Sequence, residues 1–306
     1  MGTGHLITDD RPVAMRSTKR SLRLAALASQ ALIAEAELTP KPGLVDRRGP
    51  GSHHDLTLDQ MRLSATILEP FFAEMSSTSV GRDADCSLRQ ELAEIGREAE
   101  QAMYRATEGS NTHKGAIWSL GLLAAAAARC ESQHAGEIAA EAGAIARLPD
   151  RAQPTVVTHG DIVRSRYGAA GARGEAANDF PHLVGLGLPA LRRQRAAGYS
   201  EEISRLDALL SVMSQLDDTC VLYRGGYEAL CVVRSGARAV LMAGGCGPAH
   251  GRKQLQDLDC TLLAKRISPG GSADLLAAAI FLDAVERQQG EIRKDQSEWE
   301  EFDGAA

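Results

Sequence analysis

The stretch from Arg105 to Leu120, RATEGSNTHKGAIWSL, joins two helical patterns through a polar turn. Apolar residues recur at helical spacing on both sides of it. They are Leu92, Ile95, Ala99 and Met103 before the turn, and Ile117, Leu120, Gly121 and Ala124 after it. Glycine can end the first helix, and Ser, Asn or Thr can cap the second. The stretch therefore predicts a helix, a tight polar turn and a second helix.

The turn itself is a candidate site for an anion. The first backbone N–H groups of a helix have no partner within the helix, and they attract negative charge. Lys114 stands beside those groups, and Asn111, Thr112 and His113 precede it. This composition predicts a phosphate cradle, although an ordinary helix-turn-helix with a good cap explains the turn equally well.

The composition predicts an all-α fold. The chain has 306 residues, with 44% hydrophobic and only 4% aromatic residues. Abundant alanine and leucine favour helices packed through small side chains. The net charge of −6 gives no reason to expect a nucleic-acid or membrane partner. We expect a cytoplasmic protein, because we find no signal-peptide core, no membrane-spanning run and no cysteine spacing typical of zinc ligation.

Two polar loops follow the first predicted helix. This helix begins near Ser17, and Glu35 lies at its end. The first, Thr39 to Asp46, carries Lys41 between two prolines and cannot continue the helix. The second, Gly49 to Asp55, contains two histidines next to an aspartate. Such a group can bind a metal or donate protons, but it can also simply cap the next helix.

Three later segments carry further candidates. Gly171 to Ala176 holds Arg173 and Glu175, which suit either a phosphate site or a surface ion pair. Leu216 to Gly226 places two adjacent carboxylates at a helix end, where Mg²⁺ is a plausible partner, with Arg224 close behind. Ile267 to Leu276 predicts a glycine turn that enters a helix, with Ser272 as its cap.

Together these segments resemble the triphosphoribosyl-dephospho-CoA synthase family, which serves citrate lyase and malonate decarboxylase. None of them matches a P-loop or a dinucleotide-binding fingerprint. The matching motifs lie in family order across about residues 18 to 286. They are Thr39 to Gly43 with Asp46, Gly51 to His53 with Asp55, Ala106 to Gly115, Gly171 to Ala176, Asp218 to Thr219 with Arg224 to Gly226, and Ser268 to Leu276.

The resemblance implies a transferase that joins ATP to 3′-dephospho-CoA and releases adenine. The product would pass to a phosphoribosyl-dephospho-CoA transferase that acts on an acyl carrier protein. The citrate-lyase branch tends toward Gly-Asp-Thr-Asn where this chain has Asp217 to Cys220, and toward Lys in place of His54. These departures favour the malonate-decarboxylase branch, and they argue against Asp217 and His54 as catalytic residues.

The same resemblance implies roles for the polar residues. A carboxylate can accept the proton of the attacking hydroxyl and offset positive charge on the ribose, and we assign this role to Asp218 first and to Glu35 next. His113 or His53 would protonate adenine. Substrate and phosphate contacts would come from Lys41, Asn111, Thr112, Lys114, Arg173, Glu175, Arg224, Gly270, Gly271 and Ser272. Mg²⁺ would be held by Asp46, Asp55, Asp218 or Asp274.

We therefore predict one irregular helical bundle whose active site is formed by loops at helix ends. Residues 18–287 would form the catalytic domain, between a flexible tail at 1–17 and a frayed polar tail at 288–306, with a surface loop or disordered connection at 76–87. A homodimer is one assembly that we consider. The rival functions are a helical Mg²⁺-dependent hydrolase of nucleotides or ADP-ribose adducts and a scaffold without enzymatic activity.

Overall fold

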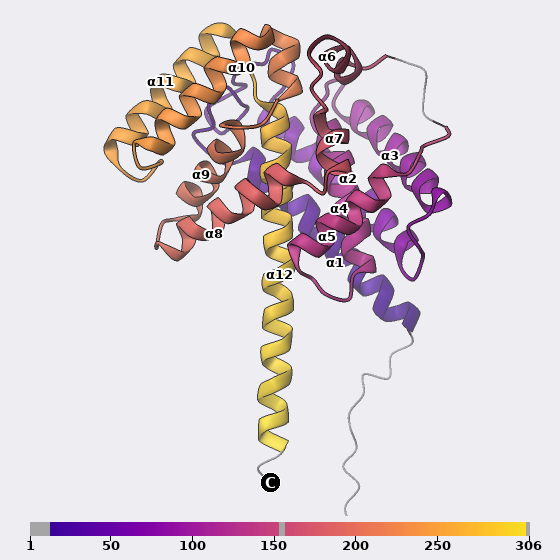
Figure 1. Cartoon of the computed structure of the whole chain (residues 1–306). Helices are drawn as coiled ribbons and strands as arrows, with labels where there is room; N and C mark the ends of the chain where they lie inside the picture. Colours follow the sequence, from indigo (N-terminus) through magenta and orange to yellow (C-terminus); the bar gives the residue numbers. More distant parts are fainter. Residues whose placement is uncertain (1–12, 153–156, 304–306) are drawn as a thin grey trace, which may run out of the picture.

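The computed structural model describes residues 13–152 and 157–303, and in this part of the chain the fold is all-α (Figure 1). Twelve α-helices and one short π-helix are present there, with no β-strand between them. The predicted fold class is confirmed. No described helix is both long and apolar enough to cross a bilayer. The six cysteines all lie in the described residues and are free thiols.

Helix α4 (Lys114–Arg129) lies at the centre of the bundle because it is apolar on nearly every side. Its run from Leu120 to Ala128 is buried throughout. Small alanine side chains allow neighbouring helices to come close, and α1 (Val13–Ala36), α2 (Leu58–Ser79) and α12 (Gly270–Asp303) all pack against it. The polar turn before α4 is thereby held at one end of the core.

The other elements surround this core. In chain order they are α3 (Cys86–Ala106), α5 (Ala135–Arg147), α6 (His159–Tyr167), α7 (Gly171–Ala177), the π-helix η1 (Leu183–Gly187), α8 (Leu188–Ala196), α9 (Glu201–Met213), α10 (Thr219–Met242) and α11 (Ala249–Lys265). Helices α10 and α11 form a pair on one side of the molecule (Figure 1). Helix α10 is kinked at Gly226, where a φ of 65° favours glycine.

Three predicted boundaries differ from the structure. The first helix begins at Val13, within the segment predicted as a flexible tail. Helix α12 continues to Asp303 and extends away from the body, so the prediction of a frayed tail from residue 288 is wrong (Figure 1). Only residues 80–85 separate α2 from α3, because Ser76 and Ser79 are buried within α2. Residues 1–12 and 304–306 of the predicted tails lie outside the described residues.

Candidate active site

The amino-terminal ends of three helices, α4, α10 and α12, meet around two aspartates. Asp218 is the N-cap of α10, and its Oδ1 accepts hydrogen bonds from the backbone N–H of Cys220 at 2.9 Å and of Val221 at 3.3 Å. The same carboxylate accepts from α12. The backbone N–H of Gly271 donates at 3.3 Å, and the N–H and Oγ of Ser272 donate at 2.8 and 2.9 Å. Asp218 therefore joins the starts of two helices.

Asp274 joins the third helix. It lies in the first turn of α12, and its half-buried carboxylate accepts a hydrogen bond from the backbone N–H of Ala116 in α4. A Cβ atom at Gly115 would lie 2.0 Å from Oδ2 of Asp274, so only glycine fits at that position. Burial raises the pKa of Asp274 well above its ordinary value, and the nearby carboxylates of Glu35 and Asp218 raise it further.

A buried ion pair lies close to these aspartates. Lys41 is only 1% exposed, and its Nζ lies 2.5 Å from Oε1 of Glu35, which is 3% exposed. Glu35 ends α1, and Lys41 follows in the loop that the prolines keep out of a helix. The pair places one cation within a group of three carboxylates, Glu35, Asp218 and Asp274, and we call these four residues the carboxylate cluster.

The loop that carries Lys41 is fastened to α11 and to the start of α12. The carboxylate of Asp46 accepts from the backbone N–H of Lys41 at 2.9 Å and from the guanidinium of Arg48 at 2.7 Å. Arg48 also contacts Asp259 of α11 at 2.6 Å. Farther along, Oγ of Ser52 donates to the carbonyl oxygen of Ile267 at 2.8 Å. These contacts bring the end of α1 to α11 and to the start of α12.

Both histidines of the site are neutral at physiological pH. His113 is buried, and burial together with the charge of Lys41 lowers its pKa to about 3. Its Nδ1 lies 2.8 Å from Oγ of Ser64, while Nε2 has no hydrogen-bond partner. Burial and Arg224 lower the pKa of His53 to about 4. A neutral imidazole is a poor general acid, which argues against the predicted role of either histidine in protonating adenine.

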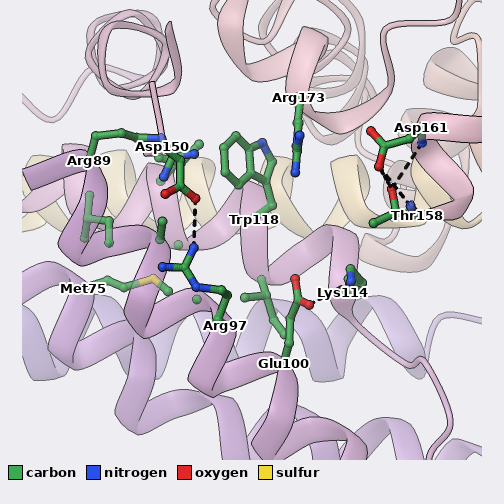
Figure 2. Close-up of a pocket in the computed structure, with 16 residues that line it drawn as sticks. Met75, Arg89, Arg97, Glu100, Lys114, Trp118, Asp150, Thr158, Asp161 and Arg173 are labelled. Atoms are coloured by element: carbon green, nitrogen blue, oxygen red, sulfur yellow. Dashed lines mark hydrogen bonds and ion pairs between the residues drawn. The ribbon is translucent and has the colours of Figure 1, made fainter. Parts of the chain in front are cut away.

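A cavity of about 310 Å³ opens beside the start of α4 (Figure 2). Lys114 stands at its edge, with Nζ 2.8 Å from a carboxylate oxygen of Glu100. Trp118, one turn along α4, lines it and donates its indole N–H to the carbonyl oxygen of Ala172 at 3.2 Å. Arg173 of α7 points toward the same space. The cavity and the carboxylate cluster are thus neighbours across Lys114 and Gly115.

Known proteins are similar to this chain along most of its length. A family described as ATP:dephospho-CoA triphosphoribosyl transferase matches residues 21–293. The chain belongs to this family. It is an enzyme with triphosphoribosyl-dephospho-CoA synthase activity, which uses ATP and dephospho-CoA.

Individual relatives cover almost the same span. A protein of Pseudomonas fluorescens (strain Pf0-1) is 52% identical over 267 residues, which is 87% of this chain and 92% of the relative. One of Pseudomonas paraeruginosa is 54% identical over 264 residues, or 86% and 90% of the two chains. One of Azotobacter vinelandii is 51% identical over 271 residues, or 88% and 93%. All three are named "probable 2-(5''-triphosphoribosyl)-3'-dephosphocoenzyme-A synthase". No solved structure matches the chain.

In this triphosphoribosyl transferase, several predicted site residues make contacts with other protein groups that stabilise the fold. Glu175 does not pair with Arg173. Its buried carboxylate accepts instead from the backbone N–H of His182 at 2.8 Å and lies 2.7 Å from Nδ1 of the same residue. Ser272 is inside α12 and is not its cap. Asn111 accepts from the backbone N–H of Lys114 at 3.2 Å.

The predicted phosphate cradle at the start of α4 is therefore occupied by protein groups, namely Asn111 and Asp274. Thr112 contacts Ser64 through its hydroxyl at 2.7 Å. Gly270 and Gly271 bring the start of α12 close to Cys220 and Asp218. Arg173 and Arg224 are exposed cations and remain accessible to a ligand, whereas Lys114 is half-buried and paired with Glu100.

The four predicted metal ligands do not form one site. Asp46 is engaged by Arg48, and Asp218 is surrounded by donors. Asp55 is exposed, 3.8 Å from His53. Among the described residues, no group of three His, Cys, Asp or Glu side chains could hold a metal ion by itself. Any Mg²⁺ would need most of its ligands from a substrate.

The sequence analysis did not identify two residues of the transferase as candidates for the site. Arg89 and Trp118 line the cavity, and the Arg89 guanidinium carbon lies 4.9 Å from the centroid of the Trp118 ring. Arg89 follows the buried Leu88 and lies one turn before the buried Leu92. A charged residue on the apolar face of a helix was the available signal, because burial of an arginine is costly unless a partner is present.

Proposed function

We propose that the enzyme forms 2′-(5″-triphosphoribosyl)-3′-dephospho-CoA with Asp274 as the general base. The 2′-hydroxyl of dephospho-CoA attacks C1′ of ATP and gives its proton to the Asp274 carboxylate. The new O2′–C1′ bond replaces the bond to adenine N9, and adenine leaves with that electron pair and takes up a proton. The observation that carries this proposal is the raised pKa of Asp274 at the meeting point of three helix ends.

Asp274 suits this role better than Asp218, our first choice from the sequence. Asp218 is fully buried and accepts donors on both oxygens, so few lone pairs are free for a hydroxyl proton. Asp274 is half-buried, and a base is most effective when its pKa approaches the working pH. Glu35 and Asp218 would supply negative charge near the ribosyl carbon as it becomes cationic.

The triphosphate of ATP would be held on the Arg224 side of the carboxylate cluster, and the diphosphate of dephospho-CoA on the other side. Arg224 donates to Nδ1 of His53 at 3.1 Å on one side, and Lys114 and Arg173 stand on the other. The starts of α7 and α10 are close, since a Cβ at Gly171 would lie 3.1 Å from Cγ2 of Thr219. Lys41 is buried against Glu35, so its role in this proposal is to hold that carboxylate in position.

Mg²⁺ fits the proposal as a companion of ATP. Bound Mg²⁺ would neutralise the phosphates, which are its usual ligands in nucleotide enzymes, with one or two protein carboxylates added. Of the four predicted ligands, Asp55 is the one whose oxygens are not committed to an arginine, to a ring of donors or to the role of the base. The chain's own task is then to orient the phosphates and to hold the base.

We place the product in the malonate-decarboxylase branch, passed to a phosphoribosyl-dephospho-CoA transferase that acts on an acyl carrier protein. The support is the sequence at Asp217 and His54. Asp217 is exposed and pairs with Arg234 at 2.8 Å, and this pair is not one of the contacts that hold the carboxylate cluster. A residue in that position can vary between branches without changing the chemistry.

The decisive experiment is chromatography with mass detection after the protein is mixed with ATP, Mg²⁺ and 3′-dephospho-CoA, and with each omitted in turn. We expect adenine only when both substrates are present, and a product heavier than dephospho-CoA by one triphosphoribosyl unit. Adenine from ATP alone would indicate a hydrolase. Asp274→Asn in a folded protein should abolish the signal, and retained turnover in this variant would remove Asp274 as the base.

A further inference from the structure

The cavity beside α4 contains a buried arginine without a partner. Arg89 is 6% exposed, and its Nε forms no hydrogen bond. Among the residues that the structure describes, no group makes a hydrogen bond or ion pair with its guanidinium, and burial lowers its pKa. The face of Trp118 lies against it, and the nearby carboxylate of Asp150, which pairs with Arg97, offsets its charge only in part. A buried cation of this kind is costly unless an anion joins it.

A second free cation faces the same space. Arg173 makes no hydrogen bond or ion pair within the described part of the chain, and its charge disfavours that of Arg89. The other charges of the cavity are already paired. Arg97 contacts Asp150 at 2.9 Å, and Lys114 contacts Glu100 (Figure 2). Two arginines that repel one another across a cavity form a suitable site for a phosphate group.

The inner wall of the cavity is apolar. It is formed by side chains of α2, α3 and α4, namely Met75, Leu92, Ala93, Ile117 and Leu122. A triphosphate is highly charged and gains no favourable contact from an apolar wall. Dephospho-CoA, in contrast, has a diphosphate in the middle of the molecule, with adenosine at one end and the less polar pantetheine arm at the other. The combination of two arginines and an apolar wall matches the middle and the arm.

We propose that this cavity binds the pantetheine arm of dephospho-CoA, with the diphosphate between Arg89 and Arg173. The adenosine end then extends past Lys114 and Gly115 toward Asp274, which is where the proposed reaction needs the 2′-hydroxyl. ATP occupies the opposite side of the carboxylate cluster, near Arg224. This assignment rests on the proposed function for its substrate, but it concerns binding and can be tested without turnover.

The first test is calorimetric titration of the full-length protein with 4′-phosphopantetheine and, separately, with AMP. Ala93→Leu fills the apolar part of the cavity, and Ala102→Leu is the control, half-buried on the same helix and outside the cavity. We expect Ala93→Leu to weaken phosphopantetheine binding about tenfold or more, with AMP unchanged. Loss of AMP binding with phosphopantetheine unaffected would overturn the assignment, as would equal effects in the two variants.

The second test compares two arginines of α3. Arg89→Met removes the cation without a partner, and Arg97→Met breaks the pair with Asp150. We expect Arg89→Met to leave the melting temperature of the free protein unchanged or raised, and to weaken phosphopantetheine binding about tenfold. Arg97→Met should lower the melting temperature. If Arg89→Met lowers the melting temperature and leaves binding intact, Arg89 is structural and the inference fails.

The two proposals fail in different ways. A protein that binds phosphopantetheine in an Arg89-dependent manner but releases no adenine retains the cavity assignment and loses the proposed reaction. If the protein releases adenine but substitution of Arg89 and of Ala93 leaves phosphopantetheine binding unchanged, the proposed reaction stands and the cavity assignment fails.

Discussion

Buried charges are paired in the carboxylate cluster, whereas in the neighbouring cavity a buried arginine has no hydrogen-bond or ion-pair partner within the described ranges 13–152 and 157–303. In the cluster, Lys41 neutralises Glu35, and Asp218 is held by backbone and hydroxyl donors of two helices. In the cavity, Arg89 is buried without a partner. Charges that are paired within the protein hold a reaction centre in position. An unpaired buried charge, in contrast, is stabilised when a ligand of opposite charge binds. Substitutions in the cluster should therefore affect turnover or stability, and substitutions in the cavity should mainly affect binding.

The largest effect should come from Asp274. Asp274→Asn removes the proposed base while preserving shape, and we expect kcat to fall about 10³-fold with an unchanged melting temperature. The base must lose its proton to act. Wild-type kcat/KM should therefore rise with pH through a pKa above the ordinary aspartate range, and the variant should lack this rise. A pH–rate profile with an unaltered acid limb in Asp274→Asn would contradict the assignment.

Lys41→Met should be next, because it leaves the buried Glu35 without its ion-pair partner. Breaking a buried pair by removing one partner costs about 3–5 kcal/mol of unfolding free energy, which urea denaturation can measure. Glu35→Gln combined with Lys41→Met should recover part of that loss. If the single variant is as stable as the wild type, the pair does not behave as the buried site that its 1% exposure indicates.

His113 should make the protein sensitive to acid. Its pKa is about 3 in the folded protein and 6.5 in the unfolded chain, so the unfolded chain binds a proton that the folded chain does not. Stability should be lost as pH falls below about 6.5, by about 1.4 kcal/mol per pH unit from this residue. His113→Gln should flatten the dependence of unfolding free energy on pH between 6.5 and 5. Parallel curves for variant and wild type would show that His113 titrates normally.

The smallest effect should be that of Mg²⁺ alone. Because no three described side chains form a metal site, Mg²⁺ without nucleotide should not shift the melting temperature. Mg²⁺ with ATP should raise it more than ATP with EDTA. A clear shift with the metal alone would indicate a protein site that the contacts around Asp46, Asp55 and Asp218 do not reveal.

Much of the candidate site was predictable because its residues lie in local patterns. Asp218 caps α10, and Asn111 accepts a hydrogen bond from the backbone N–H of Lys114 at the start of α4, as short-range rules of helix ends suggest. The same rules assigned Ser272 wrongly. Its hydroxyl contacts Asp218, which is 54 positions away in the chain. Likewise, Glu175 appeared next to Arg173 in sequence, but it faces His182 because α7 buries its carboxylate at the entry to η1.

The sequence by itself determined the all-α fold, the polar helix ends and the family, since helix periodicity, caps and motifs depend on neighbours within a few residues. Only the tertiary structure decided the state of each charge. Asp274 has a raised pKa because helix packing buries it, and because α1 and the start of α10 bring the carboxylates of Glu35 and Asp218 near it. Arg89 lacks a partner because of how α3 packs on α4. Burial and Coulomb energies are sums over groups far apart in the chain, so no local pattern contains them.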